Sequence, residues 1–131
     1  MIGLDTNILV RYLAQDDPVQ SPKAAEMIEN RLTAQNPGFV SIVAMAETVW
    51  VLGRTYRLSA AAVAAVVEHL LQIDDLVIEN EQEVFIAMVA LKEGQSSFAD
   101  ALIGALGRKA GCSHTVTFDR GALWLADFQA V

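Results

Sequence analysis

Short apolar runs alternate with helix-like segments along the whole chain. This alternation limits the number of possible folds more than any other feature of the sequence. Strands are expected at MIGL, GFVS, LVIEN and HTVTF, and FQAV at the C-terminus is a candidate edge strand. Between these runs, apolar residues recur at the spacing of one helix face. Strands that alternate with helices form a parallel sheet with helices on both faces and right-handed crossovers. The sequence therefore predicts the α/β class.

Capping residues indicate where the helices should begin and end. Serines precede several helical patterns, where each can accept a hydrogen bond from a backbone amide of the first turn. They are Ser21, followed by Pro22 at the first helical position, Ser41, Ser59 and Ser97. The Ser21 helix is expected to reach residue 35, and Gly111 is expected to close the Ser97 helix. Helices are also expected in TNILVRYLA and, as a short final one, in RGALWLADF.

Composition favours one soluble domain that spans residues 1–131. A chain of 131 residues with 53% hydrophobic content can bury a single core. No apolar run approaches the ~20 residues that span a bilayer, and no basic leader precedes the first strand. Cys112 is the only cysteine, so an internal disulfide is excluded, which fits a reducing cytoplasm. We therefore expect a cytoplasmic protein with no membrane partner.

Four acidic residues follow apolar runs or lie within helical patterns: Asp5, Glu47, Asp100 and Asp119. The carboxyl ends of parallel strands meet at one edge of a sheet, so acids far apart in the sequence can converge there. Gathered carboxylates repel each other by ~4 kcal/mol per pair at ~4 Å and an effective dielectric of ~20. A divalent cation offsets this repulsion, and hard oxygen ligands suit Mg²⁺ or Mn²⁺. The sequence therefore predicts a metal site.

Helix capping offers a purely structural explanation for three of these acids. Asp5 and Asp119 each stand between a strand and a helix, where aspartate suits an N-cap or an Asx turn. Thr6 could provide the first of these caps instead, which would leave the Asp5 carboxylate free. Asp100 has capping-box spacing from Ser97 and lies where the helix dipole favours a negative charge. Capping and metal binding are compatible, so both remain open.

Glu47 is harder to explain structurally. The residues four positions on either side of it are Val43 and Val51, so it is expected on or beside the apolar stripe of its helix. A glutamate there would lose hydration and need a partner, which a metal ion or Arg54 could supply. Zinc is disfavoured, because the two histidines and Cys112 lack metal-ligand spacing, and no P-loop, dinucleotide or nucleophile-elbow motif is present.

The acidic charge argues against a general nucleic-acid coat protein. The net charge is −7 and the pI about 4.6, whereas phosphate binding is normally driven by a basic surface. A metal ion on the acids would make the local potential positive where a phosphate sits, but a basic rim would still be needed. The candidates for that rim are Arg11, Arg54, Arg57, Arg108, Lys109 and Arg120.

The segments LDTNILVRYL, SIVAMAETVWVL, SFADALIGALGRKAGC and TVTFD, in this order, resemble the PIN domain family, specifically the VapC-type toxins of bacterial toxin–antitoxin pairs. The resemblance covers essentially the whole chain. It implies a three-layer α/β/α fold with a central, mainly parallel sheet of four to five short strands. It also implies a Mg²⁺- or Mn²⁺-dependent endoribonuclease. By motif matching, the catalytic and metal-binding residues would be Asp5, Glu47, Asp100 and Asp119, with Thr6 and Thr117 as polar support.

The resemblance also implies partners. They are an RNA substrate, contacted by Arg11, Arg54, Arg108 and Arg120, a cognate antitoxin protein, and a second copy of the chain in a homodimer. Large apolar residues that could line such surfaces, as well as the core, are Trp50, Leu52, Trp124 and Phe128.

Three other functions are compatible with parts of the pattern. A PIN-like module could bind RNA or a protein without cutting. A receiver-type signalling domain would need paired acids after the first strand and a late lysine, but the first strand supplies Asp5 alone. A haloacid-dehalogenase-like phosphatase would need DxD where this chain has Asp5, Thr6 and Asn7.

Overall fold

Three short parallel strands form the main sheet of the computed structural model, which describes all residues from 1 to 131. The strands are β1 (Ile2–Gly3), β2 (Gly38–Val40) and β3 (Leu76–Ile78), in the order β1-β2-β3. Ile2 is opposite Gly38, and Phe39 is opposite Val77. β1 is therefore an edge strand, and its carboxyl end leads directly into the first helix.

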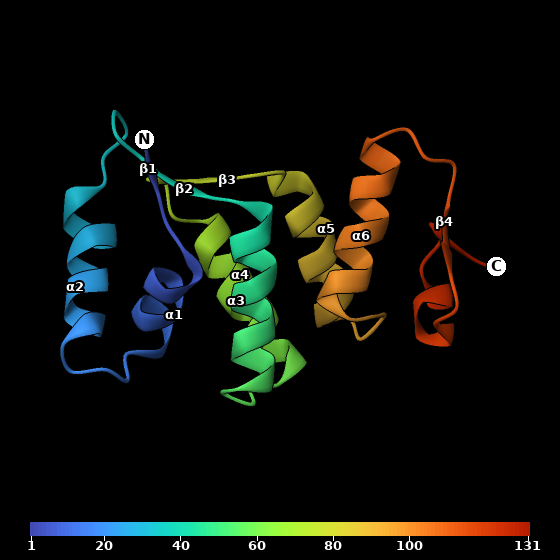
Figure 1. Cartoon of the computed structure of the whole chain (residues 1–131), viewed down its shortest axis with the longest axis horizontal. Coiled ribbons are helices and arrows are strands. Elements are labelled where there is room, and N and C mark those ends of the chain that lie inside the picture. Colours follow the sequence, from blue (N-terminus) through green and yellow to red (C-terminus); the bar gives the residue numbers. More distant parts are fainter.

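Six α-helices surround the strands and confirm the predicted α/β class (Figure 1). The helices that follow β1 are α1 (Thr6–Ala14) and α2 (Gln20–Glu26), which continues as a π-helical turn, η1 (Met27–Arg31). Those that follow β2 and β3 are α3 (Ile42–Arg54), α4 (Ala60–Leu71), α5 (Glu81–Lys92) and α6 (Phe98–Lys109). None of these helices is long and apolar enough to cross a bilayer.

The C-terminal strands form a second sheet. β4 (Thr115–Thr117) pairs in parallel with β5 (Phe128–Ala130), and a short 3-10 helix, η2 (Arg120–Trp124), connects them. Figure 1 shows this unit at the far end of the molecule, with α5 and α6 between it and the β1–β3 sheet. The parallel α/β/α architecture with five strands is thus confirmed, but the strands form two sheets and not the expected single central one.

Phe128 holds the second sheet against α6. Its ring lies so close to Gly104 that a Cβ atom at that position would come within 2.7 Å of Phe128 Cε2. Arg108 of α6 also forms a 3.2 Å ion pair with Asp127, the residue before β5. This packing holds β5, and with it the paired strand β4, against α6.

The serine caps are confirmed at three of the four helices. Ser41, Ser59 and Ser97 each accept a hydrogen bond of 3.1 Å from the amide three residues later. Gly111 has a positive φ of 99° at the end of α6, as expected.

The prediction for Ser21 was wrong. α2 begins at Gln20, because Asp17 Oδ1 accepts hydrogen bonds from the amides of Val19 at 2.9 Å and Gln20 at 2.7 Å. Ser21 is buried in the first turn, where its Oγ accepts a 3.3 Å bond from the Asp17 amide. The helical segment also ends at Arg31, earlier than expected.

The core lies between the main sheet and the helices. Leu9 of α1, Val40 of β2, Met45 of α3 and Leu70 of α4 are fully buried and belong to one cluster. α1 and α3 are therefore fixed relative to each other and to the carboxyl end of β1. These two helices carry the residues of the candidate site.

Candidate functional site

Asp5 lies at the carboxyl end of β1 and is the N-cap of α1. Its Oδ1 accepts a 3.0 Å hydrogen bond from the Ile8 amide, so aspartate, and not Thr6, caps this helix. The side chain is exposed, and Oδ2 takes no part in the cap. One oxygen of Asp5 thus stabilises the helix while the other is available to a ligand.

Glu47 of α3 lines the same open pocket as Asp5, with a volume of 460 Å³. Thr6 and Arg11 of α1 and Tyr56 also line this Asp5–Glu47 pocket. Two of the four predicted acids, 42 residues apart in the sequence, therefore share one cavity at the carboxyl end of β1. This is the edge of the sheet where the strand pattern predicted a site.

The expected burial of Glu47 was wrong. Glu47 is exposed, and its helix neighbours Val43 and Trp50 are 73% and 60% exposed. The buried face of α3 is formed instead by Ala44, Met45, Thr48 and Leu52. Glu47 therefore needs no partner to offset lost hydration, and its shared pocket with Asp5 is the stronger reason to assign it to the site.

Asp100 and Asp119 lie outside the Asp5–Glu47 pocket. Asp100 is in the first turn of α6, where its amide donates to Ser97 Oγ, and its carboxylate takes part in none of the three ion pairs. Asp119 is the N-cap of η2, with Oδ1 accepting a 2.8 Å hydrogen bond from the Gly121 amide. Thr117, two residues earlier, accepts a 2.9 Å hydrogen bond from the Asp119 amide through its Oγ1.

No group of three or more acidic, histidine or cysteine residues is close enough to hold a metal ion together. The expected convergence of the four acids is thus found for Asp5 and Glu47 only. Asp119 is separated because β4, the strand before it, belongs to the second sheet.

Comparison with known families gave one decisive result. The family model described as "PIN domain" matches residues 2–127. The chain belongs to the PIN domain family. PIN domains have a nuclease-type fold, so the family and the fold agree with the expectation from the sequence. A search of curated proteins gave no match.

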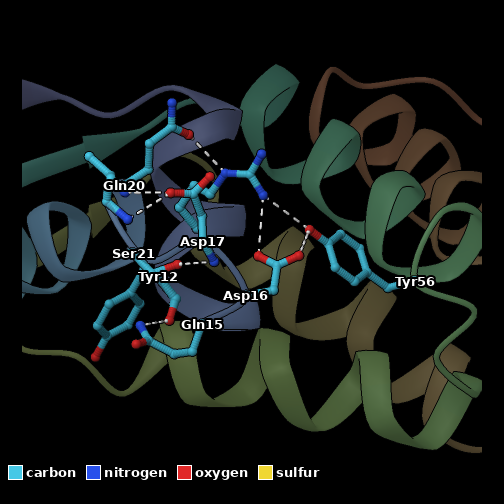
Figure 2. Close-up of polar contacts among 9 residues, drawn as sticks. Tyr12, Gln15, Asp16, Asp17, Gln20, Ser21 and Tyr56 are labelled. Atoms are coloured by element: carbon cyan, nitrogen blue, oxygen red, sulfur yellow. Dashed lines mark hydrogen bonds and ion pairs between the residues drawn. The ribbon is translucent and has the colours of Figure 1, made fainter.

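Arg11 is held rigidly at the wall of the pocket in this PIN domain. Its Nη1 donates to Asp16 Oδ1 at 3.2 Å and to Tyr56 Oη at 3.3 Å, and its Nε donates to Gln20 Oε1 at 2.9 Å. Tyr56 Oη in turn donates to Asp16 Oδ2 at 2.8 Å, and Figure 2 shows this side chain pointing at the Asp16 carboxylate. The hydrogen bond to Asp16 raises the pKa of Tyr56, with smaller contributions from burial and from the Asp16 charge.

A second groove adjoins the Asp5–Glu47 pocket between α1 and the α2–η1 segment. It has a volume of 640 Å³ and shares Asn7 and Arg11 with the pocket. Lys23 and Arg31 also line it, and both are exposed and outside the ion pairs. We call this the basic groove, defined by Arg11, Lys23 and Arg31, and Glu26 is the one acidic residue that lines it. The sequence analysis missed Lys23 and Arg31, although their spacing of eight residues, about two helical turns, was a usable signal.

The other predicted arginine contacts are dispersed over the PIN domain. Arg54 lies over the Trp50 ring, with Cζ 6.0 Å from its centroid. Arg108 is paired with Asp127, and Arg120 is exposed at the start of η2. Of the four predicted RNA-contacting arginines, Arg11 alone lines the Asp5–Glu47 pocket.

The donor atoms of the pocket fit a hard divalent cation. The Asp5 and Glu47 carboxylates, with the Thr6 and Thr55 hydroxyls and the Asn7 amide nearby, supply oxygen ligands only. Mg²⁺ is commonly held by one or two carboxylates together with water and substrate phosphates. Asp5 and Glu47 are two carboxylates that line one pocket, whereas a site of three or four carboxylates is not formed.

Proposed function

We propose that this PIN domain is a Mg²⁺- or Mn²⁺-dependent endoribonuclease that hydrolyses RNA phosphodiester bonds at the Asp5–Glu47 pocket. The observation that carries the proposal is the shared pocket of Asp5, Glu47 and Arg11 in a chain of nuclease-type fold. Two carboxylates beside a fixed guanidinium give adjacent places for a cation and for an anionic phosphate.

Each pocket residue has a separate task in this proposal. Asp5 Oδ2 and Glu47 would hold the cation, whose charge acidifies water and stabilises the charge that develops on the phosphate. Arg11 would bind a phosphate oxygen through its guanidinium, a geometry that suits phosphate well. Because Asp16, Gln20 and Tyr56 already orient Arg11, little conformational freedom is lost when the phosphate binds. The sequence motifs also assign Asp100 and Asp119 to the proposed acidic set, and both lie outside this pocket.

The basic groove extends the proposed RNA path away from the cleavage site. In a chain with a net charge of −7, Lys23 and Arg31 are unpaired cations beside the pocket. A neighbouring phosphate of the same RNA strand could enter the groove while the scissile phosphate contacts Arg11. This supports a polynucleotide substrate over a small phosphate ester.

Attack by water predicts products with a 5′-phosphate and a 3′-hydroxyl. A test is to incubate the protein with single-stranded and structured RNAs in Mn²⁺, Mg²⁺ or EDTA and to identify the product ends. Glu47→Gln should abolish cleavage, whereas Glu81→Gln, at an exposed residue at the start of α5, should retain it. Cleavage that ignores EDTA, or products with cyclic phosphate ends, would contradict the proposal.

We further propose that the protein is the cytoplasmic toxin of a toxin–antitoxin pair. This proposal is supported by the order of the motifs that contain Asp5, Glu47, Asp100 and Asp119. Expression of the wild-type chain should arrest growth, and co-expression of a small antitoxin encoded beside the gene should restore it. Growth arrest by Glu47→Gln to the wild-type level would exclude RNA cleavage as the cause.

A non-cleaving PIN module is the second candidate function. One observation favours it: a single chain brings only two of the four acids into one pocket. Such a module would bind RNA or protein through the basic groove and leave RNA intact with every divalent cation. The cleavage assay above therefore separates the two functions.

A further inference from the structure

Ser41 forms a one-residue corner between β2 and α3. β2 ends at Val40, and α3 begins at Ile42. Ser41 Oγ caps the helix by accepting from the Ala44 amide, but this bond is local and does not connect α3 to a neighbouring strand. The direction in which α3 leaves the sheet is therefore sensitive to contacts that other segments make on either side of Ser41.

Glu79 binds the backbone on both sides of this corner. It directly follows β3, and its amide donates to the carbonyl oxygen of Val40 at 2.9 Å, next to the pairing of β3 with β2. Its Oε1 accepts a 2.8 Å hydrogen bond from the amide of Ile42. One residue, 37 positions away from Ile42 in the sequence, thus ties the last residue of the strand to the first residue of the helix.

A carboxylate suits the start of α3. The first amides of a helix have no partner within the helix, and the helix dipole favours a negative charge beside them. Hydrogen bonds to a charged acceptor are stronger than those between neutral groups. Glu79 is half-buried, so its contact with water is reduced. Its bond to Ile42 is therefore a strong local constraint on the position of the helix.

The chain is also held immediately after Glu79. Asn80 has a positive φ of 53°, and its Oδ1 accepts a 2.6 Å hydrogen bond from Lys109 Nζ. The same amine lies 3.3 Å from Oε1 of Glu83, which is buried. These contacts connect the end of α6 to the start of α5 and restrict the backbone that carries Glu79.

Glu47 lies between two points at which other segments hold α3 and the turn after it. Glu79 holds Ile42, five residues before Glu47, and the hydrogen bond made by Tyr56 follows nine residues after Glu47. A helix that tilts about its start moves Glu47 relative to Asp5, which lies on a different element. Glu79 does not line the Asp5–Glu47 pocket, so it reaches the pocket through α3 and not by direct contact.

We propose that Glu79 is a positioning residue for the proposed cleavage reaction: by holding the start of α3, it places Glu47 at the distance from Asp5 that a divalent cation requires. The inference rests on the proposed function, because it concerns the two cation-binding carboxylates of that site. In this role Glu79 contacts neither the cation nor the RNA. Misplacement of a reacting group by about 1 Å can lower a rate about 100-fold, so a small tilt of α3 should be measurable.

Three variants separate positioning from simple stabilisation. Glu79→Ala removes the acceptor, whereas Glu79→Gln keeps an oxygen that can accept from the Ile42 amide. Ser59→Ala is the matched control, because Ser59 caps α4 through a 3.1 Å hydrogen bond from the Ala62 amide. That substitution removes the cap of a helix that contributes no residue to the Asp5–Glu47 pocket.

The affinity for Mn²⁺, measured by electron paramagnetic resonance without RNA, is the first readout. Glu79→Ala should weaken it roughly tenfold, a loss typical of replacing a group that orients a metal ligand. Glu79→Gln and Ser59→Ala should bind Mn²⁺ almost as the wild type does. Wild-type affinity in Glu79→Ala, or an equal loss in Ser59→Ala, would overturn the inference. An equal loss in Glu79→Gln would overturn it too, because the charge and not the hydrogen bond would then be responsible.

RNA cleavage gives a second readout. Glu79→Ala should lower kcat roughly 10- to 100-fold and change KM less, because Arg11 and the basic groove still bind the RNA. Glu79→Gln should restore most of the lost kcat. A change confined to KM in Glu79→Ala would overturn the inference.

NMR of the metal-free protein distinguishes failure of this inference from failure of the proposed function. Glu79→Ala should accelerate solvent exchange of the Ile42 amide and shift the Glu47 amide resonance, whereas Ser59→Ala should do neither. If the wild type neither binds Mn²⁺ nor cleaves RNA, the proposed function fails, and the two NMR changes still decide whether Glu79 positions Glu47. If the wild type binds and cleaves but neither NMR change is seen, the inference is wrong while the proposed function stands.

Discussion

Tyr56 donates a 2.8 Å hydrogen bond to Asp16, and this bond joins the segment after α3 to the segment after α1. α3 carries Glu47, and α1 begins directly after Asp5. Arg11 contacts both members of the bond, so the orientation of the guanidinium depends on it. Contacts that involve neither acid therefore help to set the geometry of the Asp5–Glu47 pocket, together with the helix cap made by Asp5.

Tyr56→Phe should loosen this connection. We expect a loss of about 0.5–1.5 kcal/mol in the free energy of unfolding, as is typical for one hydrogen bond, and a higher KM for RNA with a smaller change in kcat. Urea unfolding of Tyr56→Phe, Asp16→Asn and the double variant measures the coupling. Strictly additive effects would mean that the bond contributes nothing in solution.

Lys23→Glu combined with Arg31→Glu should weaken RNA binding through the basic groove. For single-stranded RNA, the loss of two phosphate contacts reduces the slope of log K against log salt by about 1.4. Lys92→Glu, at the exposed end of α5, is the control for a change of charge elsewhere. Fluorescence anisotropy in EDTA measures binding without cleavage. An unchanged slope in the double variant would exclude the groove from the RNA path.

Gly104→Ala should separate the second sheet from α6. The added Cβ would lie 2.7 Å from Phe128 Cε2, and overpacking of this kind typically costs about 1–3 kcal/mol. Gly53→Ala is the matched control, because Gly53 lies within α3 and has open space around the Cβ position. Alanine should stabilise that helix by roughly 0.5–1 kcal/mol. Equal stabilisation by both substitutions would disprove the close contact.

Substitution of Asp5 should separate its two roles. Asp5→Asn keeps a capping oxygen, so the stability of the metal-free protein should change little, whereas RNA cleavage should be lost. Asp5→Ala removes the cap as well and should cost about 0.5–2 kcal/mol. Thermal melts in EDTA and cleavage assays in Mn²⁺ provide both measurements. Retained cleavage in Asp5→Asn would remove this carboxylate from the proposed site.

Asp17 should contribute to acid sensitivity. Hydrogen bonds from the Gln20 and Val19 amides hold its pKa below the usual value of 3.8. Since the folded-state pKa is the lower one, this stabilisation is complete above about pH 3.8 and is lost as the pH falls through the folded-state pKa. Unfolding of Asp17→Asn should therefore depend less on pH in acid than unfolding of the wild type. Equal acid sensitivity of Asp17→Asn and the wild type would contradict this role.

The local parts of the fold could be predicted from the sequence. Helix starts at Ser41, Ser59 and Ser97 depend on a bond to an amide three residues away, so the chain itself contains the signal. The prediction for Ser21 was wrong because the helix begins earlier. Asp17, four residues before Ser21, accepts hydrogen bonds from the amides of Val19 and Gln20. Two competing caps within one turn could not be ranked without coordinates.

The non-local parts could not be predicted. The alternating pattern indicates parallel strands, but it does not say which strand lies beside which. β4 pairs with β5, and Phe128 of β5 packs on Gly104, a contact between residues 24 apart that no periodicity reveals. The shared pocket of Asp5 and Glu47 agrees with the prediction from the strand pattern, because β1 ends and α3 begins at the same edge of the main sheet. Asp119 is separated because β4 belongs to the second sheet, and the periodicity of α3 did not show that Ala44, Met45, Thr48 and Leu52 form its buried face.

Asp5 divides its two oxygens between the start of a helix and an open cavity. A single base change in its codon can produce asparagine, which still begins the helix but no longer carries the negative charge. Descendants of such a gene could therefore lose the chemistry in one step and keep an intact shape. Evolution from a cutting enzyme to a silent binding protein would then need no redesign of the scaffold.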